Sequence, residues 1–124
     1  MSFQVEKKGK IVVLKVLAER LDGNVSPSLK AEVTVVSGEG NKNMIMDLSP
    51  VRYCDSSGLS AVLVANRLCK NSNGTFVLIG LQDAVRKLIS ISQLDSILNI
   101  TKNIEEASEK IELAEIEREA ESEH

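Results

Sequence analysis

Residues 43–59, Asn-Met-Ile-Met-Asp-Leu-Ser-Pro-Val-Arg-Tyr-Cys-Asp-Ser-Ser-Gly-Leu, contain the transition that decides the fold. Residues 43–47 are a short apolar run between turn signals, which is typical of a buried strand. The loop over residues 48–55 carries Pro50, and Asp-Ser-Ser-Gly then has the composition of a helix start. We expect Asp55 or Ser56 to cap the first turn of this helix, because the first amide groups of a helix lack partners within it.

Strand and helix patterns alternate on both sides of this stretch. The predicted strands cover residues 3–6, 11–17, 43–47, 75–80 and 97–100, and the predicted helices cover residues 26–36, 57–70, 82–91 and 104–116. The first two strands form a predicted hairpin, and the first helix is predicted to begin with Ser26 as N-cap and Pro27 at its first position. Continuous apolar strands joined by helical connections indicate an α/β fold: a single domain with a mixed, mostly parallel sheet of four to five strands and packed helices.

The composition restricts the kinds of partner. A length of 124 residues suffices for one domain with one main core. The net charge of −3 gives no general attraction to nucleic acid or anionic membranes, and the few aromatic residues argue against a base-stacking surface. No apolar run approaches the ~20 residues that span a bilayer, and residues 1–10 lack the pattern of a signal peptide. We therefore expect a cytoplasmic protein that binds neither nucleic acid nor membrane.

Catalytic and metal-binding chemistry is not expected. The one histidine, His124, is the last residue, so it cannot anchor a buried catalytic relay or a histidine-based metal site. Cys54 and Cys69 have no metal-binding spacing and are predicted to be reduced thiols with a packing role. Cys54 beside Asp55 is the best candidate for a nucleophile, but the sequence offers no base to activate it. We predict no catalytic residue, no metal and no cofactor.

The Asp-Ser-Ser-Gly segment has two interpretations. The simpler one is helix capping, which any α/β protein needs. The other is phosphorylation, since Ser56 and Ser57, followed by Gly58, place two hydroxyl groups at the positive end of a helix, where a phosphate is electrostatically favoured.

In its context this segment resembles a known signature. The run over residues 44–59 is similar to the core motif of bacterial anti-anti-sigma factors of the STAS superfamily. Leu21-Asp22 matches the turn that precedes the first helix of that family, and residues 74–80 and 81–94 match its next strand and helix in order and spacing. The resemblance covers roughly residues 3–110. Tyr53-Cys54 departs from it, because apolar or small residues are more usual before the motif.

The resemblance implies a function and a set of site residues. Ser56 aligns with the serine that is phosphorylated by the cognate anti-sigma factor, which is itself a serine kinase. Asp22, Asp55, Ser57 and Gly58 align with positions at the partner surface, where the glycine keeps the helix start open. The unphosphorylated protein is then expected to bind and sequester the anti-sigma factor and so release a sigma factor, and a metal-dependent serine phosphatase restores this form. We expect a monomer or a weak dimer.

Another use of a STAS domain remains open at this point. The alternative function is that of a STAS scaffold or a regulatory subunit in a stressosome-like or lipid-transport complex. Scaffold proteins usually carry an additional sensory domain, which we do not expect in 124 residues.

The acidic end of the chain is predicted to be an extension of the domain. We place the STAS domain at residues 1–110 and an acidic helical or disordered extension at residues 111–124. Beyond Glu115 the glutamates alternate with few apolar residues, so the helix is expected to fray into solvent. Deletion of residues 115–124 is accordingly expected to change stability and partner affinity little, and a partner-binding tail is the alternative.

Overall fold

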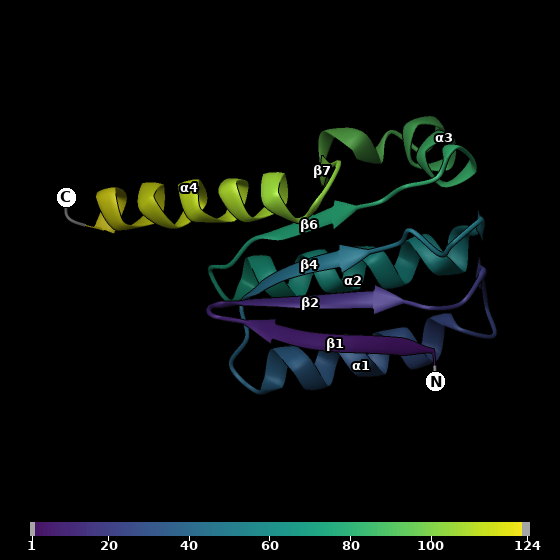
Figure 1. Ribbon diagram of the computed structural model, residues 1–124, viewed down its shortest axis with the longest axis horizontal. Helices are drawn as coiled ribbons and strands as arrows, with labels where there is room; N and C mark the ends of the chain where they lie inside the picture. Colours follow the sequence, from purple (N-terminus) through teal and green to yellow (C-terminus); the bar gives the residue numbers. More distant parts are fainter. Residues whose placement is uncertain (1, 123–124) are drawn as a thin grey trace.

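A five-stranded mixed sheet forms the centre of the computed structural model, which describes residues 2–122 (Figure 1). Its strand order is β1-β2-β4-β6-β7. The strands are β1 (Phe3–Lys8), β2 (Ile11–Val16), β4 (Asn43–Asp47), β6 (Phe76–Ile79) and β7 (Asn99–Thr101). β1 pairs with β2 as an antiparallel hairpin and the other pairs are parallel. The predicted α/β class and mostly parallel sheet are confirmed.

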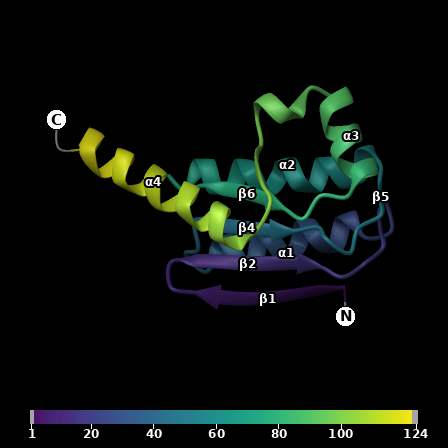
Figure 2. The same cartoon turned by 45° about the horizontal axis from the view of Figure 1, so that its top comes forward.

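Helices cover both faces of this sheet. α1 (Ser26–Gly38) and α2 (Ser56–Asn71) lie together on one face, and α4 (Ile104–Ser122) crosses β4 and β6 on the other face (Figure 2). α3 (Asp83–Ile91) and the short 3-10 helix η1 (Leu94–Ser96) pack beside each other near one end of the sheet. Figure 1 shows α4 running back along β6 and extending past the end of the sheet.

Burial on both faces explains why the central strands are apolar without interruption. Met44 and Met46 of β4 contribute to the large core beneath α1 and α2, whereas Ile45 between them contributes to a smaller core beneath α4. The smaller core consists of Val13, Ile45, Val77, Ile79, Ala107 and Ile111. Successive side chains of a strand point to opposite faces, so the middle of a strand that is covered on both faces carries apolar side chains at successive positions.

A second sheet, of only two strands, was not predicted. β3 (Arg20–Leu21) pairs in parallel with β5 (Tyr53–Cys54). The sequence patterns assigned the first segment to a turn and the second to a loop. Strands of two residues are too short to show a period of two, so only their pairing identifies them.

The start of α1 differs from the prediction. Val25 is the N-cap, and Ser26 is the first helical residue and makes no side-chain cap. The Oγ of Ser26 instead donates to the carbonyl oxygen of Asp22 at 2.7 Å, and the same oxygen accepts from the amide groups of Val25 and Ser26. The assignment of Ser26 as N-cap is therefore wrong by one position, because the carbonyl of Asp22 already organises this turn.

The expectation that α4 frays beyond Glu115 is also wrong. The helix continues to Ser122, and its last turns are attached to the amino ends of β4 and β6 by polar contacts. Nη2 of Arg118 donates to the carbonyl oxygen of Gly74 and to Oγ1 of Thr75, both at 2.7 Å. Glu115 accepts a hydrogen bond from Nδ2 of Asn43 at 3.2 Å. His124 lies outside the described residues, and the division of the chain at residues 110 and 111 stays a prediction.

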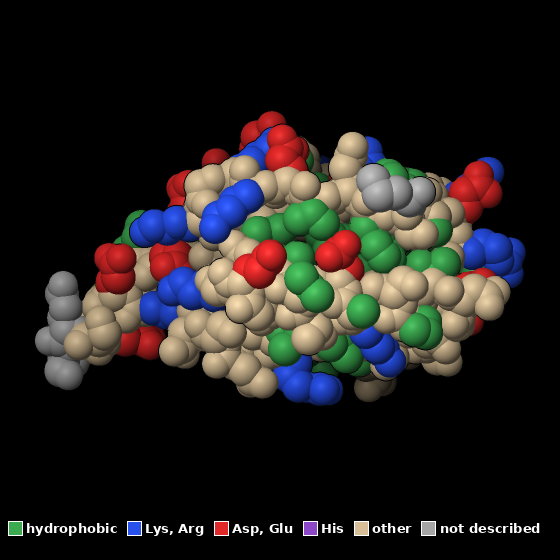
Figure 3. All heavy atoms as spheres, turned by 90° about the horizontal axis from the view of Figure 1, so that it is seen from below, with side chains coloured by type: hydrophobic (Ala, Val, Ile, Leu, Met, Phe, Trp, Pro, Cys, Tyr) green, Lys and Arg blue, Asp and Glu red, His purple; other side chains and the backbone are tan. Residues whose placement is uncertain are grey.

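The outer edge of β1 carries charged side chains, which protect an unpaired strand edge from pairing with other chains. Figure 3 shows the side of the molecule that holds β1 and α1, where hydrophobic side chains reach the surface between acidic and basic ones. None of the described helices has the length and hydropathy needed to cross a bilayer.

Candidate functional site

The short β3–β5 sheet brings the two predicted aspartates together. Leu21 pairs with Cys54 in this sheet, so Asp22 and Asp55 leave neighbouring strands at the same end. The amide of Asp55 donates to the carbonyl oxygen of Leu21 at 3.3 Å. The predicted site residues therefore gather where the turn before α1 meets the start of α2.

Of the two predicted capping residues, Asp55 and Ser56, it is Asp55 that caps α2. Its backbone is extended, and its Oδ1 accepts a hydrogen bond from the amide of Gly58 at 3.1 Å. The carbonyl oxygen of Asp55 accepts from the amide of Leu59 at 3.0 Å. Within residues 2–122, the amides of Ser56 and Ser57 have no acceptor. Two free N–H groups thus remain at the positive end of the helix.

The two serines have different environments. Ser56 is exposed, whereas Ser57 is half-buried and faces Gly23, at which an added Cβ would lie 3.8 Å from Oγ of Ser57. Both belong to a shallow hollow of about 400 Å³ between the starts of α1 and α2. Its lining residues are Gly23, Ser26, Pro27, Lys30, Ser56, Ser57 and Ser60.

Lys30 supplies the one charged side chain of this lining. It is half-buried, and no carboxylate among the described residues forms an ion pair with it. No sequence pattern indicates Lys30, because only the packing of α1 against α2 places it beside the serines.

Gly58 is required for packing. A Cβ at this position would lie 2.6 Å from Sγ of Cys54 and 2.9 Å from Cγ of Leu21, and it would also overlap the carbonyl oxygen of Leu21. Gly58 is itself buried. The glycine thus lets β3 approach the first turn of α2. The resemblance implied that the glycine keeps this turn open, whereas in the structure the turn is packed.

Asp22 takes part in local structure as well. Its Oδ1 accepts from the amide of Asn24 at 3.0 Å, and its Oδ2 lies 3.8 Å from Nε of Arg20. The guanidinium of Arg20 stacks 4.3 Å from the ring centroid of Tyr53. Tyr53 is 43% exposed, so it adds an aromatic surface beside the two aspartates. In the sequence, Tyr53 is distinguished only as a departure from the family pattern.

Cys54 is not a reactive thiol in this structure. Burial, with a smaller contribution from the negative charge of Asp55, raises the pKa of Cys54 to about 11. Its Sγ donates to the carbonyl oxygen of Asp55 at 3.4 Å. Cysteine nucleophiles need a low pKa and access to substrate, and Cys54 has neither. Among residues 2–122, no group of three or more His, Cys, Asp or Glu side chains is arranged to hold a metal ion.

Two helices thus pack on one face of a mixed sheet, and the second helix begins with a pair of serines after the capping Asp55. The chain belongs to the STAS domain family, whose model matches residues 2–107. The anti-sigma-B factor antagonist of Listeria monocytogenes is 30% identical to it over 89 residues, which are 72% of this chain and 77% of that protein.

Solved structures show the same fold. An anti-sigma factor antagonist from Mycobacterium paratuberculosis superposes with a TM-score of 0.79 at 22% identity, covering 89% of this chain and 92% of that one. The Bacillus cell fate determinant SpoIIAA in its phosphorylated form gives a TM-score of 0.67 at 23% identity, covering 88% of this chain and 98% of that one.

Proposed function

We propose that the protein is an anti-sigma factor antagonist that acts by binding and not by catalysis. Its unphosphorylated form binds and sequesters an anti-sigma factor that is also a serine kinase, and a sigma factor is thereby released. Phosphorylation of Ser56 ends the binding, and a metal-dependent serine phosphatase restores it. The named function of the Listeria relative supports the general role.

The exposure of Ser56 at the first position of α2 carries this proposal. A kinase must reach the hydroxyl group that it phosphorylates, and Ser56 is open to solvent whereas Ser57 is half-buried against the loop at Gly23. The side chain of Asp55 accepts a hydrogen bond from the amide of Gly58 and so fixes the backbone conformation at Ser56. Ser56 is therefore the better substrate of the two serines.

The start of α2 can accommodate a phosphate without refolding. A phosphoserine adds about −1.5 to −2 charges and three acceptor oxygens. The free amides of Ser56 and Ser57, and the positive end of the helix, favour an anion at this place. Lys30 lines the same hollow and contributes a positive charge.

Loss of partner binding then arises at the interface, through repulsion and steric intrusion. The surface concerned contains Ser56 and Ser57, together with the adjoining Asp22 and Tyr53. Couplings of about 1–3 kcal/mol, which are typical of switches, change an affinity roughly 5- to 150-fold.

Phosphorylation by the cognate kinase tests the assignment of the site. The protein is incubated with the kinase and ATP, and the modified peptide is mapped by mass spectrometry. We expect phosphate on Ser56, no incorporation in Ser56→Ala, and retained incorporation in the control Ser57→Ala. Phosphate that persists in Ser56→Ala and disappears in Ser57→Ala would contradict the assignment.

Binding by Ser56→Asp, measured by calorimetry, tests the mechanism with the same kinase partner. We expect its free energy of unfolding to stay within about 1 kcal/mol of the wild type, since a carboxylate is tolerated at a helix start, while its affinity falls. Ser90→Asp, on the exposed side of α3, places an equal charge elsewhere and should bind normally. If Ser56→Asp loses binding only in proportion to unfolding, the switch acts through stability and this mechanism is wrong.

A further inference from the structure

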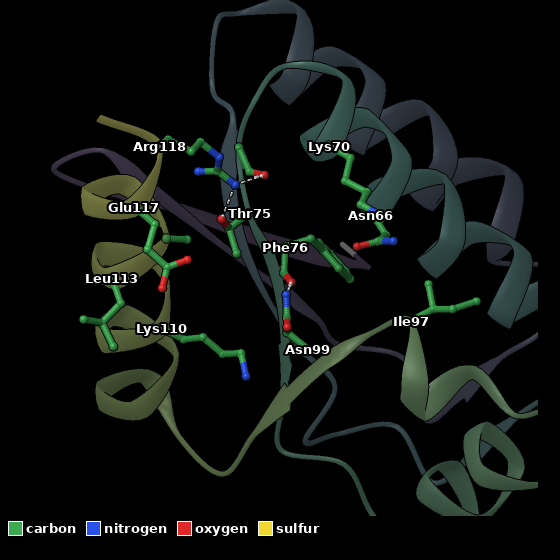
Figure 4. Close-up of a pocket in the computed structure, with 12 residues that line it drawn as sticks. Asn66, Lys70, Thr75, Phe76, Ile97, Asn99, Lys110, Leu113, Glu117 and Arg118 are labelled. Atoms are coloured by element: carbon green, nitrogen blue, oxygen red, sulfur yellow. Dashed lines mark hydrogen bonds between the residues drawn. The ribbon is translucent and has the colours of Figure 1, made fainter. Parts of the chain in front are cut away.

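A second pocket lies far from Ser56, between α2, β6, the segment before β7, and α4 (Figure 4). Its volume is about 360 Å³, which is within the usual range of small-molecule sites. Asn66 and Lys70 extend into it from α2, and Lys110 and Leu113 extend from α4 on the opposite side. The proposed switch uses none of these side chains.

Asn66 is the unexplained residue of this pocket. It is only 8% exposed, yet its side-chain amide makes no hydrogen bond within residues 2–122. In the same part of the chain, no fully enclosed side-chain nitrogen or oxygen lacks a partner. The amide of Asn66 must therefore reach the open space of the pocket. Buried amides are normally paired, so this group is available for a ligand.

The charges of the pocket favour an anion. Lys70, Lys110 and Arg118 give three positive charges and Glu117 gives one negative charge, so the lining has a net charge of +2 in a chain of net charge −3. Among the described residues neither Lys70 nor Lys110 forms an ion pair, whereas Arg118 is engaged with Glu115 and Gly74. The two lysines thus present free ammonium groups from opposite walls.

Part of the remaining lining is apolar. The ring of Phe76 forms the floor, and Ile97 and Leu113 stand at the rim with more than half of their surface exposed. These two side chains offer apolar surface beside the lysines. An anionic group that contacts the lysines would place an attached hydrocarbon group over this surface.

We propose that this pocket binds a small organic anion, a carboxylate or a phosphate monoester with a short apolar group. Asn66, Lys70 and Lys110 hold the anionic group, and Ile97 and Leu113 contact the apolar part. The ligand bridges α2 and α4, so it holds α4 against the domain. This inference does not depend on phosphorylation of Ser56.

Nuclear magnetic resonance titration of the full chain tests the pocket with n-butyl phosphate and with hexanoate. We expect saturable shifts of the side-chain amide of Asn66 and of backbone amides in residues 110–118, from one compound or both, and the better compound identifies the anionic group. Inorganic phosphate and 1-butanol, which each lack one half of the ligand, should bind severalfold more weakly. If neither organic anion gives saturable shifts there, or inorganic phosphate binds as tightly as butyl phosphate, the proposal is overturned.

Variants locate the binding in the pocket. Lys70→Gln and Lys110→Gln should each weaken binding about tenfold, which corresponds to one hydrogen bond to a charged group, and Glu117→Gln should strengthen it. Asn66→Asp keeps the shape of the side chain and should abolish binding by repulsion. Lys87→Gln, at an exposed site on α3, is the charge-matched control and should bind as the wild type does. Equal affinities of Lys110→Gln and Lys87→Gln would show that the anion is attracted only by surface charge, which would overturn the proposal. Both lysines are exposed, so this comparison holds even if Asn66→Asp does not fold.

Discussion

Replacement of Gly58 by alanine tests whether the first turn of α2 is packed or open. In an open helix start, alanine would stabilise the protein, because it forms helices better than glycine by about 1 kcal/mol. In this structure the new methyl group would overlap the carbonyl oxygen of Leu21 and would lie 2.6 Å from Sγ of Cys54. The carbonyl group cannot withdraw freely, because it accepts a hydrogen bond from the amide of Asp55.

The expected magnitude follows from these two opposing effects. Overpacking of a close-packed interior costs about 1–3 kcal/mol, and more when backbone must move. Because the overlap involves a backbone carbonyl group, the upper part of this range, about 2–3 kcal/mol, applies to Gly58→Ala. After the helical gain of about 1 kcal/mol is subtracted, the free energy of unfolding should fall by about 1–2 kcal/mol. Displacement of β3 would also shift Asp22 relative to Ser56, so partner affinity should fall as well.

Gly38→Ala is the matched control. Gly38 is the last residue of α1, and a Cβ there would meet no atom within 4 Å. Urea denaturation followed by circular dichroism should show that Gly38→Ala is at least as stable as the wild type, whereas the midpoint for Gly58→Ala is lower. A Gly58→Ala protein as stable as Gly38→Ala would refute the close approach of β3 to α2.

Two further predictions concern the attachment of α4. Arg118→Met leaves the carbonyl group of Gly74 and the hydroxyl group of Thr75 without their donor. Urea denaturation should show that the free energy of unfolding falls by about 1–2 kcal/mol, whereas the exposed control Arg67→Met should change it little. Equal stabilities of the two variants would mean that the end of α4 is not docked. Burial alone would raise the pKa of Glu115, but the hydrogen bond from Asn43 and the charges of Lys42 and Arg118 outweigh it and hold that pKa below the ordinary value of 4.5. The ionised carboxylate therefore stabilises the fold fully above pH 4.5, and this contribution is lost as the pH falls through the lower folded-state value. The stability difference between wild type and Glu115→Gln should shrink over that acidic range, and a difference independent of pH would contradict the ion pairing.

The strands and helices of the main sheet could be predicted because their causes are local. Residues 44–46 and 76–79 are apolar throughout, which shows that both faces of each strand are covered. The cap at Asp55 depends on an amide only three residues further along the chain. Residues 56 and 57 could therefore be placed at a helix start, and the resemblance to the STAS family assigned them a function.

The remaining features depend on contacts between residues that are far apart in the sequence. β3 and β5 exist only as a pair, and the reason for a glycine at position 58 is the carbonyl oxygen of Leu21 across that pair. Lys30 reaches the serines only through the packing of α1 on α2. The acidic end of the chain has few apolar residues at helical spacing, yet Arg118 binds Thr75 from 43 residues away. Polar anchors have no period along a helix, so only the tertiary structure decided that the last turns of α4 are attached to the amino ends of β4 and β6.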